Sequence, residues 1–220
     1  MKGLKRNIAS IMVVLSMAFT LFGCVGLGGK SSDKEKFIGS WKAKIDVADV
    51  LNNSMKQGDS GMADYVNIDK FEFVFLFTFN DDGTYSIAAD RDSIEENLDA
   101  IKPDIKKGII EYLEGEIEKS GLGITVDEML EITGNSLDDM IDENFKVSMF
   151  DSSFESMETE GKWKVENEKL YMNKGTNGDF DDDDAVPYEF ISEGIKLSAP
   201  EDADEDYLEM MFPMILKKVN

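Results

Sequence analysis

Residues 71–79 alternate phenylalanine with other side chains along the run Phe71-Glu72-Phe73-Val74-Phe75-Leu76-Phe77-Thr78-Phe79. A period of two places all the phenylalanines on one face of a strand, and that face must be buried. The opposite face carries Val74 and Leu76 in its middle, so it also requires partial cover. Turn-forming residues follow in Asn80-Asp81-Asp82-Gly83, and residues 84–89 again have strand character. The pattern predicts an antiparallel hairpin in a sheet with a large aromatic core.

Further segments of strand character lie on both sides of a long helical stretch. Before it, residues 41–46 alternate with Trp41, Ala43 and Ile45 on one face, and a short helix or loop is expected at 47–67. After it, short candidate strands are separated by Gly, Asn or Asp turns. These candidates are residues 145–150, 153–159, 161–165, 169–172, 187–192, 195–197 and 211–217. About ten candidates result, some of which can merge, and they suffice for a closed antiparallel barrel without exposed edges.

The period changes to three or four between residues 91 and 144. One apolar stripe consists of Ile94, Leu98, Ile101, Ile105, Ile109, Leu113 and Ile117. Pro103 is expected to divide this segment into two helices, because the residue before a proline resists helical angles. The run 125–128 has capping-box order, Gly134 is expected to end that helix, and Ser136 can cap another. We therefore expect a mainly β, α+β protein with a helical insertion at about 91–144.

The first residues have the order of a secretory signal. Three cations, Lys2, Lys5 and Arg6, precede an uncharged apolar run over 8–22 that is shorter than the roughly 20 residues of a membrane-spanning helix. The segment ends in Leu21-Phe22-Gly23-Cys24, which resembles the lipobox of bacterial lipoproteins, although Phe22 stands where a small residue is usual.

That resemblance implies cleavage between Gly23 and Cys24 and a diacylglyceryl group on the Cys24 thiol. Cys24 is the only cysteine of the chain, so no intramolecular disulfide forms, and lipidation accounts for the lone thiol. The alternative is an ordinary secretory signal whose cysteine is incidental.

The expected domain organisation follows from these segments. Residues 1–23 are a signal peptide, 24–35 a lipidated flexible tether rich in Gly and Ser, and 36–220 one folded domain. The mature protein is expected on the extracytoplasmic face of the cell membrane, held there by its lipid anchor. Loss of residues 1–23 changes the formal charge from −23 to −26, an excess that repels nucleic acid and anionic headgroups. Nucleic acid is thereby excluded as a partner.

Several short motifs resemble those of the lipocalin-like domains of bacterial lipoproteins. They are Gly39-Ser40-Trp41, the turn of residues 79–85 with Gly83, Gly161-Lys162-Trp163 followed by Leu170, and the terminal segment 212–218. In that group a Gly-x-Trp opens the first strand, and hairpins carry a Phe-Asn-x-x-Gly turn. The resemblance covers residues 37–89 and 145–219, and it does not cover the helical insertion.

The resemblance implies an up-and-down β-barrel with a mouth at one end and a non-catalytic activity. It also implies that Trp41 packs across the closed bottom of the barrel. For Trp41 and Trp163 alike, plain core packing is the alternative, because buried aromatic side chains belong chiefly to cores.

Catalysis is expected to be absent. The chain contains no histidine, and its sole cysteine is expected to carry lipid. Ser-His-Asp and Cys-His catalysis and the common zinc sites are therefore removed. Asp and Glu together number 46, and with so many no spacing singles out a pair for glycoside hydrolysis.

Calcium is the one cofactor for which the sequence offers candidate ligands. Residues 179–184 and 201–206 are both dense in carboxylates, and calcium accepts about six to eight oxygens in irregular loops. The candidate ligands of a weak calcium site are Asp181, Asp182, Asp183 and Asp184. A solvated acidic loop is the alternative, since neither run matches the EF-hand pattern.

Two functions remain open. In the first, the protein is a structural or protein-interaction module of the cell envelope, with a filled barrel and a helical face that docks another envelope protein. In the second, the barrel mouth binds a small apolar or amphiphilic ligand, and the helices of residues 93–144 act as a lid or wall. The first is favoured, because the phenylalanines of one strand would fill much of a small barrel.

Overall fold

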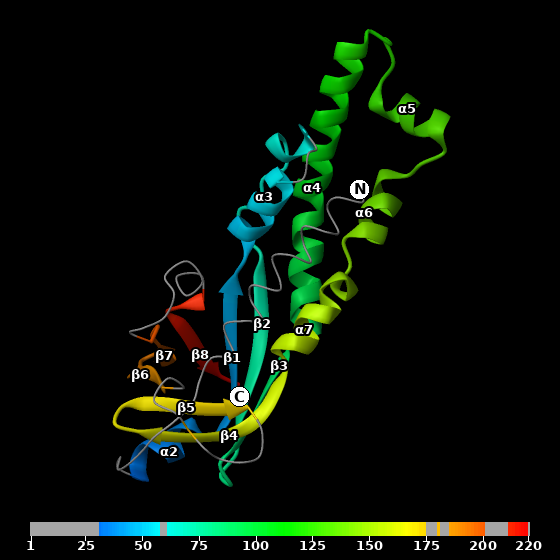
Figure 1. Ribbon diagram of the computed structural model, residues 1–220. Helices are drawn as coiled ribbons and strands as arrows, with labels where there is room; N and C mark the ends of the chain where they lie inside the picture. Colours follow the sequence, from blue (N-terminus) through cyan, green and yellow to red (C-terminus); the bar gives the residue numbers. More distant parts are fainter. Residues whose placement is uncertain (1–30, 58–60, 175–179, 181–184, 201–210, 220) are drawn as a thin grey trace. The chain divides into compact units, whose positions relative to one another are not determined.

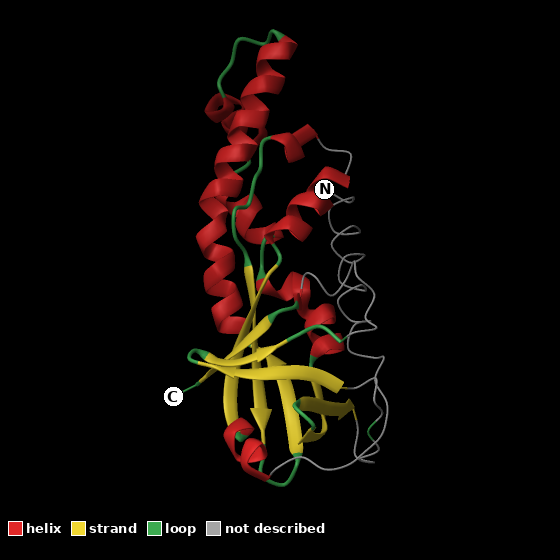
Figure 2. Cartoon of the chain, turned by 90° about the vertical axis from the view of Figure 1, so that its left-hand side faces the viewer, coloured by secondary structure: helices red, strands yellow, loops and turns green. Residues whose placement is uncertain are grey.

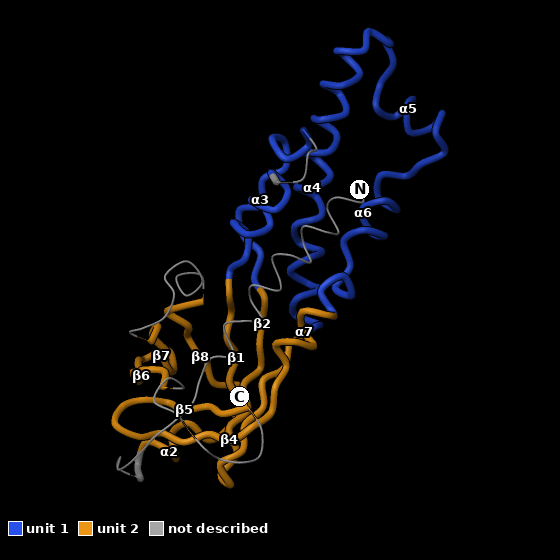
Figure 3. The backbone as a smooth tube through the Cα atoms, viewed as in Figure 1, with its two compact units in different colours: residues 1–11, 46–72, 91–151 blue, residues 12–45, 73–90, 152–220 orange. Residues whose placement is uncertain are grey.

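The chain divides into two compact units (Figure 3). A computed structural model describes residues 31–57, 61–174, 180, 185–200 and 211–219. The helical unit comprises Asp46–Glu72 and Arg91–Asp151, and the barrel unit comprises the described residues up to Ile45, Phe73–Asp90 and those from Ser152 onward. The helical unit is therefore built from two segments inserted into the chain of the barrel.

The described strands of the barrel unit form a closed antiparallel barrel of eight strands in sequential order (Figures 1 and 2). The strands are β1 (Gly39–Asp46), β2 (Glu72–Phe79), β3 (Thr84–Ala89), β4 (Thr159–Glu166), β5 (Lys169–Lys174), β6 (Ala185–Ile191), β7 (Gly194–Leu197) and β8 (Met214–Lys218). The barrel closes where Trp41 of β1 lies opposite Lys218 of β8. The predicted fold class, an α+β protein with an antiparallel up-and-down barrel and a helical insertion, is confirmed.

The phenylalanine strand and its hairpin are also as predicted. β2 pairs with β3, with Phe77 opposite Ile87. Gly83 occupies the turn at φ +78°, a conformation that favours glycine. All the phenylalanines of β2 are buried, and so is Val74 on its opposite face. One strand thus supplies a large share of the aromatic core.

Two segments that were predicted to be strands are helical, and those predictions are wrong. Residues 145–150 contain the 3₁₀ helix η2 (Val147–Phe150), and residues 153–159 mostly belong to α7 (Asp151–Met157). In α7 the buried residues Ser153, Phe154 and Met157 are spaced for a helix face. Short apolar runs fit either period, and here burial of that face decided between them. Helix consequently continues to Met157, past the predicted end near Asn144.

The predicted break at Pro103 does not occur. α4 (Arg91–Ser120) is one helix of 30 residues with Pro103 inside it. A proline in a helix interior costs about 3 kcal/mol. Buried side chains lie on both sides of it, Leu98 and Ile101 before and Ile105 after, and their packing outweighs that local cost.

The remaining helices of the helical unit follow the predicted signals. They are α3 (Ala48–Gln57), η1 (Gly61–Asp64), α5 (Val126–Thr133) and α6 (Leu137–Asn144). Thr125 and Glu128 form the predicted capping box of α5, and Gly134 ends it in the left-handed conformation. Beyond α4 the chain turns back, and α5 and α6 contact α4 (Figure 1). Gly108 lets α4 approach residue 65 closely, because an added Cβ would lie 2.5 Å from the Tyr65 carbonyl oxygen.

The predicted tether of residues 24–35 needs a correction at its end. Helix α2 (Ser31–Phe37) already begins within it, because Phe37 is fully buried and requires an ordered chain before β1. The predicted signal peptide and residues 24–30 lie outside the described residues. None of the helices that the structure describes is long and apolar enough to cross a membrane.

The turn between β4 and β5 offers a test of backbone strain. Asn167 and Glu168 both have positive φ, 51° and 61°. A side chain in this conformation costs roughly 1–2 kcal/mol, of which glycine recovers part. Glu168→Gly is therefore expected to raise the free energy of unfolding by about 0.5–1 kcal/mol, measured by urea denaturation. Glu160→Gly in the exposed part of β4 is the control, and a loss of stability in both variants would contradict the expectation.

Candidate interaction surface

Some of the sequence-predicted site residues cannot be placed. Gly23 and Cys24, the expected processing and lipidation site, lie outside the described residues, and so do the candidate calcium ligands Asp181, Asp182, Asp183 and Asp184. Among the residues that are described, no group of three or more His, Cys, Asp or Glu is placed to hold a metal ion.

The fold-motif residues gather where α2 meets the barrel. Phe37 is fully buried, with its ring centroid 4.8 Å from Tyr188, 5.5 Å from Phe190, 5.6 Å from Phe79 and 5.9 Å from Trp163. These rings come from β6, β2 and β4, so α2 inserts one side chain among strands far apart in the sequence. This arrangement closes the end of the barrel at which the β2–β3 turn lies, where Lys34 of α2 donates to the Asp81 carbonyl at 2.9 Å.

Trp41 and Trp163 have structural roles in this closed end. The Trp41 Nε1 donates to the Phe37 carbonyl at 2.6 Å, and the Lys218 ammonium lies 5.2 Å from the Trp41 ring centre. Trp163 donates to the Asn80 carbonyl at 3.0 Å, which ties β4 to the β2–β3 turn. Both rings are buried, so the core-packing interpretation holds for each of them.

The motif glycines are explained by space and conformation. At Gly161 an added Cβ would lie 1.8 Å from the Asn173 carbonyl oxygen, which leaves no room for any side chain. Gly39 and Gly83 both have positive φ, 124° and 78°. The motif that the sequence presents is therefore a framework for the barrel and contributes no reactive group.

Tyr188 adds a partly buried hydrogen bond to the same end of the barrel. Burial raises the pKa of Tyr188 to about 12, and the Asp33 carboxylate strengthens the shift. The Tyr188 hydroxyl therefore stays protonated at neutral pH and donates to Asp33 Oδ2 at 3.2 Å. This contact holds α2 in place.

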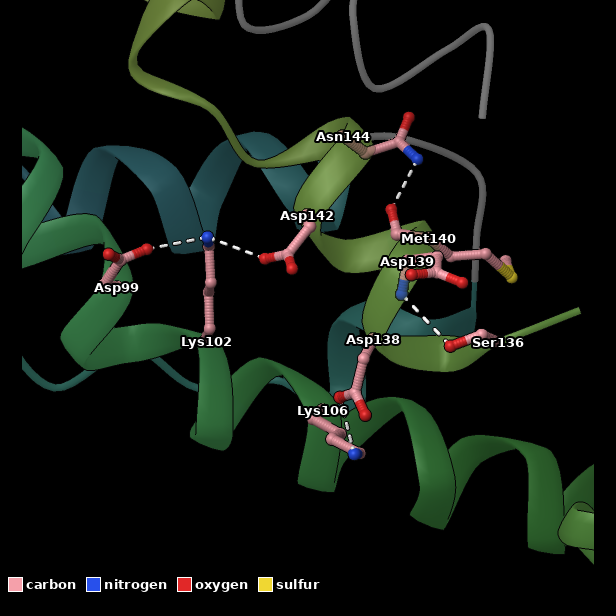
Figure 4. Close-up of polar contacts among 9 residues, drawn as sticks. All are labelled: Asp99, Lys102, Lys106, Ser136, Asp138, Asp139, Met140, Asp142 and Asn144. Atoms are coloured by element: carbon pink, nitrogen blue, oxygen red, sulfur yellow. Dashed lines mark hydrogen bonds and ion pairs between the residues drawn. The ribbon is translucent and has the colours of Figure 1, made fainter.

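In the helical unit, α6 covers the first half of α4. Leu137 and Ile141 of α6 are buried. Figure 4 shows Lys102 of α4 between Asp99 and Asp142, at 2.7 and 2.8 Å. The hydrogen bonds that Lys102 donates to Asp142 and Asp99 raise the pKa of Lys102 above its ordinary value.

A second lysine and a helix cap complete the α4–α6 contact. Lys106 donates to Asp138 Oδ1 at 2.6 Å, and the Ser136 hydroxyl accepts from the Asp139 amide at 3.3 Å (Figure 4). Exposed ion pairs contribute little to stability, so burial of the apolar residues of α6 is what holds this helix against α4. The two lysines fix the position of α6 along α4.

The second half of α4 is covered far less. The stripe residues Ile94, Leu98, Ile101 and Ile105 are buried, whereas Ile109, Leu113 and Ile117 remain half-exposed. Two further large apolar side chains are exposed to solvent: Leu122, which follows α4, is 65% exposed, and Ile132 of α5 is 75% exposed. We call residues 109–133, from the second half of α4 to the end of α5, the distal surface.

An open groove of about 500 Å³ lies within the distal surface. Its lining residues are Glu114, Ile117, Glu118, Gly121, Gly123, Ile124, Thr125 and Val126. Ile117 belongs to the predicted apolar stripe, and Thr125 and Val126 belong to the predicted capping-box run, but these patterns did not predict a groove. The one available signal was that the apolar stripe of α4 is longer than any following helix that could cover it.

A separate small cavity in the helical unit is too small for an organic ligand. It is apolar and measures about 20 Å³. Its lining residues are Leu51, Ser54, Met55, Ile68, Leu98, Ile101, Phe145, Met149 and Phe150. A single water needs roughly 10–15 Å³, so the space admits about one water molecule. The buried Ser54 hydroxyl has no hydrogen-bond partner in the part of the chain that the structure describes, and one water would satisfy it.

No protein-family model, no curated protein and no solved structure matches this chain. The geometry of the closed barrel and of the distal surface is therefore the basis for a functional assignment.

Proposed function

We propose that this chain is a lipid-anchored protein of the extracytoplasmic membrane face, and that its helical unit is a non-catalytic docking module for another envelope protein. The exposure of Leu122 and Ile132 carries the proposal. Leu122 lies between Gly121 and Gly123, which line a groove, and both exposed residues share the distal surface with half-exposed residues of α4. Grouped apolar side chains in contact with water are typical of protein–protein interaction sites.

The packing inside the barrel also supports a docking function. Its phenylalanines pack on one another, with centroids 6.5 Å apart for Phe73 and Phe75 and 6.4 Å for Phe77 and Phe79. A barrel filled in this way favours docking over the binding of a small apolar ligand in its mouth. The lipocalin-like resemblance of the motifs agrees with an eight-stranded closed barrel, and we assign the chain to that kind of lipoprotein domain as part of the proposal.

The anchor places one end of the barrel near the membrane. Only residues 25–30 separate the lipid-bearing Cys24 from α2. An extended chain spans at most about 3.5 Å per residue, so the first residue of α2 lies within about 25 Å of the lipid. The domain is thereby held close to the membrane surface while its acidic charge keeps it off anionic headgroups.

Site-specific photocrosslinking in the native cells tests the docking function. A photoreactive amino acid at Leu122 is expected to capture one discrete envelope protein, because this side chain is exposed beside the groove. The same partner should copurify with the intact chain and be lost with a Leu122→Asp/Ile132→Asp variant. Mass spectrometry of the crosslinked band provides the measurement.

The matched controls use exposed positions outside the distal surface. A crosslinker at Lys107, whose side chain is 77% exposed on α4, should not give the band. Val219→Asp, at another exposed apolar residue in the barrel unit, should leave copurification unchanged. The same band from both crosslinker positions, or no discrete band from Leu122, would sink the proposal.

A further inference from the structure

The groove in the distal surface combines an apolar floor with an acidic edge. Ile117 and Ile124 are half-exposed and Val126 is buried at 8% exposure, so the floor of the groove is apolar. Glu114 and Glu118 line the same groove one helical turn apart, so their carboxylates share one side of α4. Both glutamates are exposed.

The charge along this edge is not compensated within the distal surface. Residues 109–133 contain seven acidic side chains and one lysine. That lysine, Lys119, is paired with Glu116 at 2.9 Å. Within the described residues, neither the Glu114 nor the Glu118 carboxylate forms an ion pair with a cation. The groove therefore has negative charge available for a partner.

Local turn conformations and a helix cap fix the shape of the groove without a ligand. Gly121 and Gly123 have φ of 66° and 64°, and the Gly121 amide donates to the Glu118 carbonyl at 3.1 Å. Thr125 and Glu128 cap α5 reciprocally, at 3.2 Å from the Glu128 amide to the Thr125 hydroxyl and 2.8 Å from the Thr125 amide to the Glu128 carboxylate. A preformed groove lowers the entropic cost of binding.

We propose that this groove binds a cationic amphipathic segment of another protein, with its apolar side chains on Ile117, Ile124 and Val126 and its Lys or Arg side chains on Glu114 and Glu118. Complementary charge specifies the segment, because an uncharged apolar peptide would leave the acidic edge unpaired and an acidic one would be repelled. An amphipathic helix laid in an apolar groove is a common recognition mode. The proposal deepens the docking function and rests on it.

Binding of synthetic peptides to the full chain, purified in detergent, tests the proposal by fluorescence anisotropy. The probe is a labelled 18-residue helix with Leu on one face and Lys on the other, a length of about five turns. Its two relatives replace every Leu with Ser or every Lys with Glu. We expect the parent peptide to bind and both relatives to bind about tenfold more weakly or worse, because each lacks one of the two complements.

Charge-reversal variants locate the site. Glu114→Lys/Glu118→Lys is expected to weaken binding of the parent peptide about tenfold at physiological salt. The matched control is Glu95→Lys/Glu96→Lys, which makes the same change in net charge at exposed residues of the first half of α4. It should weaken binding less than about twofold, because screening limits charge effects beyond roughly 8 Å. Circular dichroism melts verify that both variants fold.

If both charge-reversal variants weaken binding of the parent peptide equally, the proposal is overturned, because the peptide would then be attracted only to the net charge of the protein. Strong binding of the Ser-substituted peptide would also overturn it. Groove-dependent sedimentation of a Cys24→Ser chain with phosphatidylglycerol vesicles would reassign the groove to lipid. The docking function is tested separately, by the crosslink at Leu122. If a partner is crosslinked but the peptides bind without selectivity, only the cationic segment is rejected. If no partner is crosslinked, docking itself is rejected.

Discussion

Replacing Phe37 with alanine is expected to lower the free energy of unfolding of the protein by about 3–5 kcal/mol. This is the range for truncating a large buried aromatic side chain. The Phe37 ring is fully buried and contacts rings from three strands. Loss of the ring leaves a cavity at the closed end of the barrel. Trp163 and Tyr188 cannot move to fill this cavity without breaking their hydrogen bonds. Urea denaturation followed by tryptophan fluorescence measures the loss, and Trp41 and Trp163 both report on this end.

The control for Phe37→Ala removes an apolar side chain that the fold does not bury. Leu122→Ala, at 65% exposure, is expected to change stability by no more than about 0.5 kcal/mol. A loss below about 1 kcal/mol for Phe37→Ala would show that α2 is not part of the folded barrel. α2 would then belong to the tether, as its sequence first indicated.

If Cys24 carries the proposed lipid, a Cys24→Ser variant is expected to lose its attachment to the membrane completely. Without a thiol no diacylglyceryl group can be attached, and the chain is left unprocessed or released. Cell fractionation with immunoblotting and intact mass of the product measure both effects. Two acyl chains give stable attachment where one is marginal, so the change is close to all-or-none.

The control for anchoring is a substitution in the tether that keeps the thiol. Gly26→Ser should remain lipidated and in the membrane fraction, because its position follows the proposed cleavage site. A Cys24→Ser chain that is still processed and membrane-bound without lipid would refute the anchoring proposal. The photocrosslinking result does not depend on this outcome, because it reports on the distal surface alone.

Much of the barrel could be predicted from sequence because its signals are local. The period of two in β2 requires one buried face whatever the neighbours are, and Gly83 marks the turn by its conformation. The capping box at Thr125 and Glu128 likewise needs only residues three apart. Such features depend on the geometry of residues close in sequence, and the contacts that stabilise them lie within the same short segment.

The errors occurred where local preference conflicts with burial. Pro103 is unfavourable in a helix, yet α4 continues through it because its buried stripe extends on both sides. Phe154 and Met157 fit a short strand or a helix equally well by their apolar character, and burial on one helical face decided for α7. Propensity is a small term that packing overrides.

By itself the sequence determined the antiparallel sheet, the helical insertion, the lack of histidine and the acidic charge, because each follows from residue type and spacing. Only the tertiary structure decided that α2 closes the barrel with Phe37 and that α6 covers just the first half of α4. Both depend on which surfaces far apart in the chain meet, and no spacing rule encodes that. The uncovered end of the predicted apolar stripe, at Ile109, Leu113 and Ile117, lies in the distal surface, where Ile117 lines the proposed docking groove.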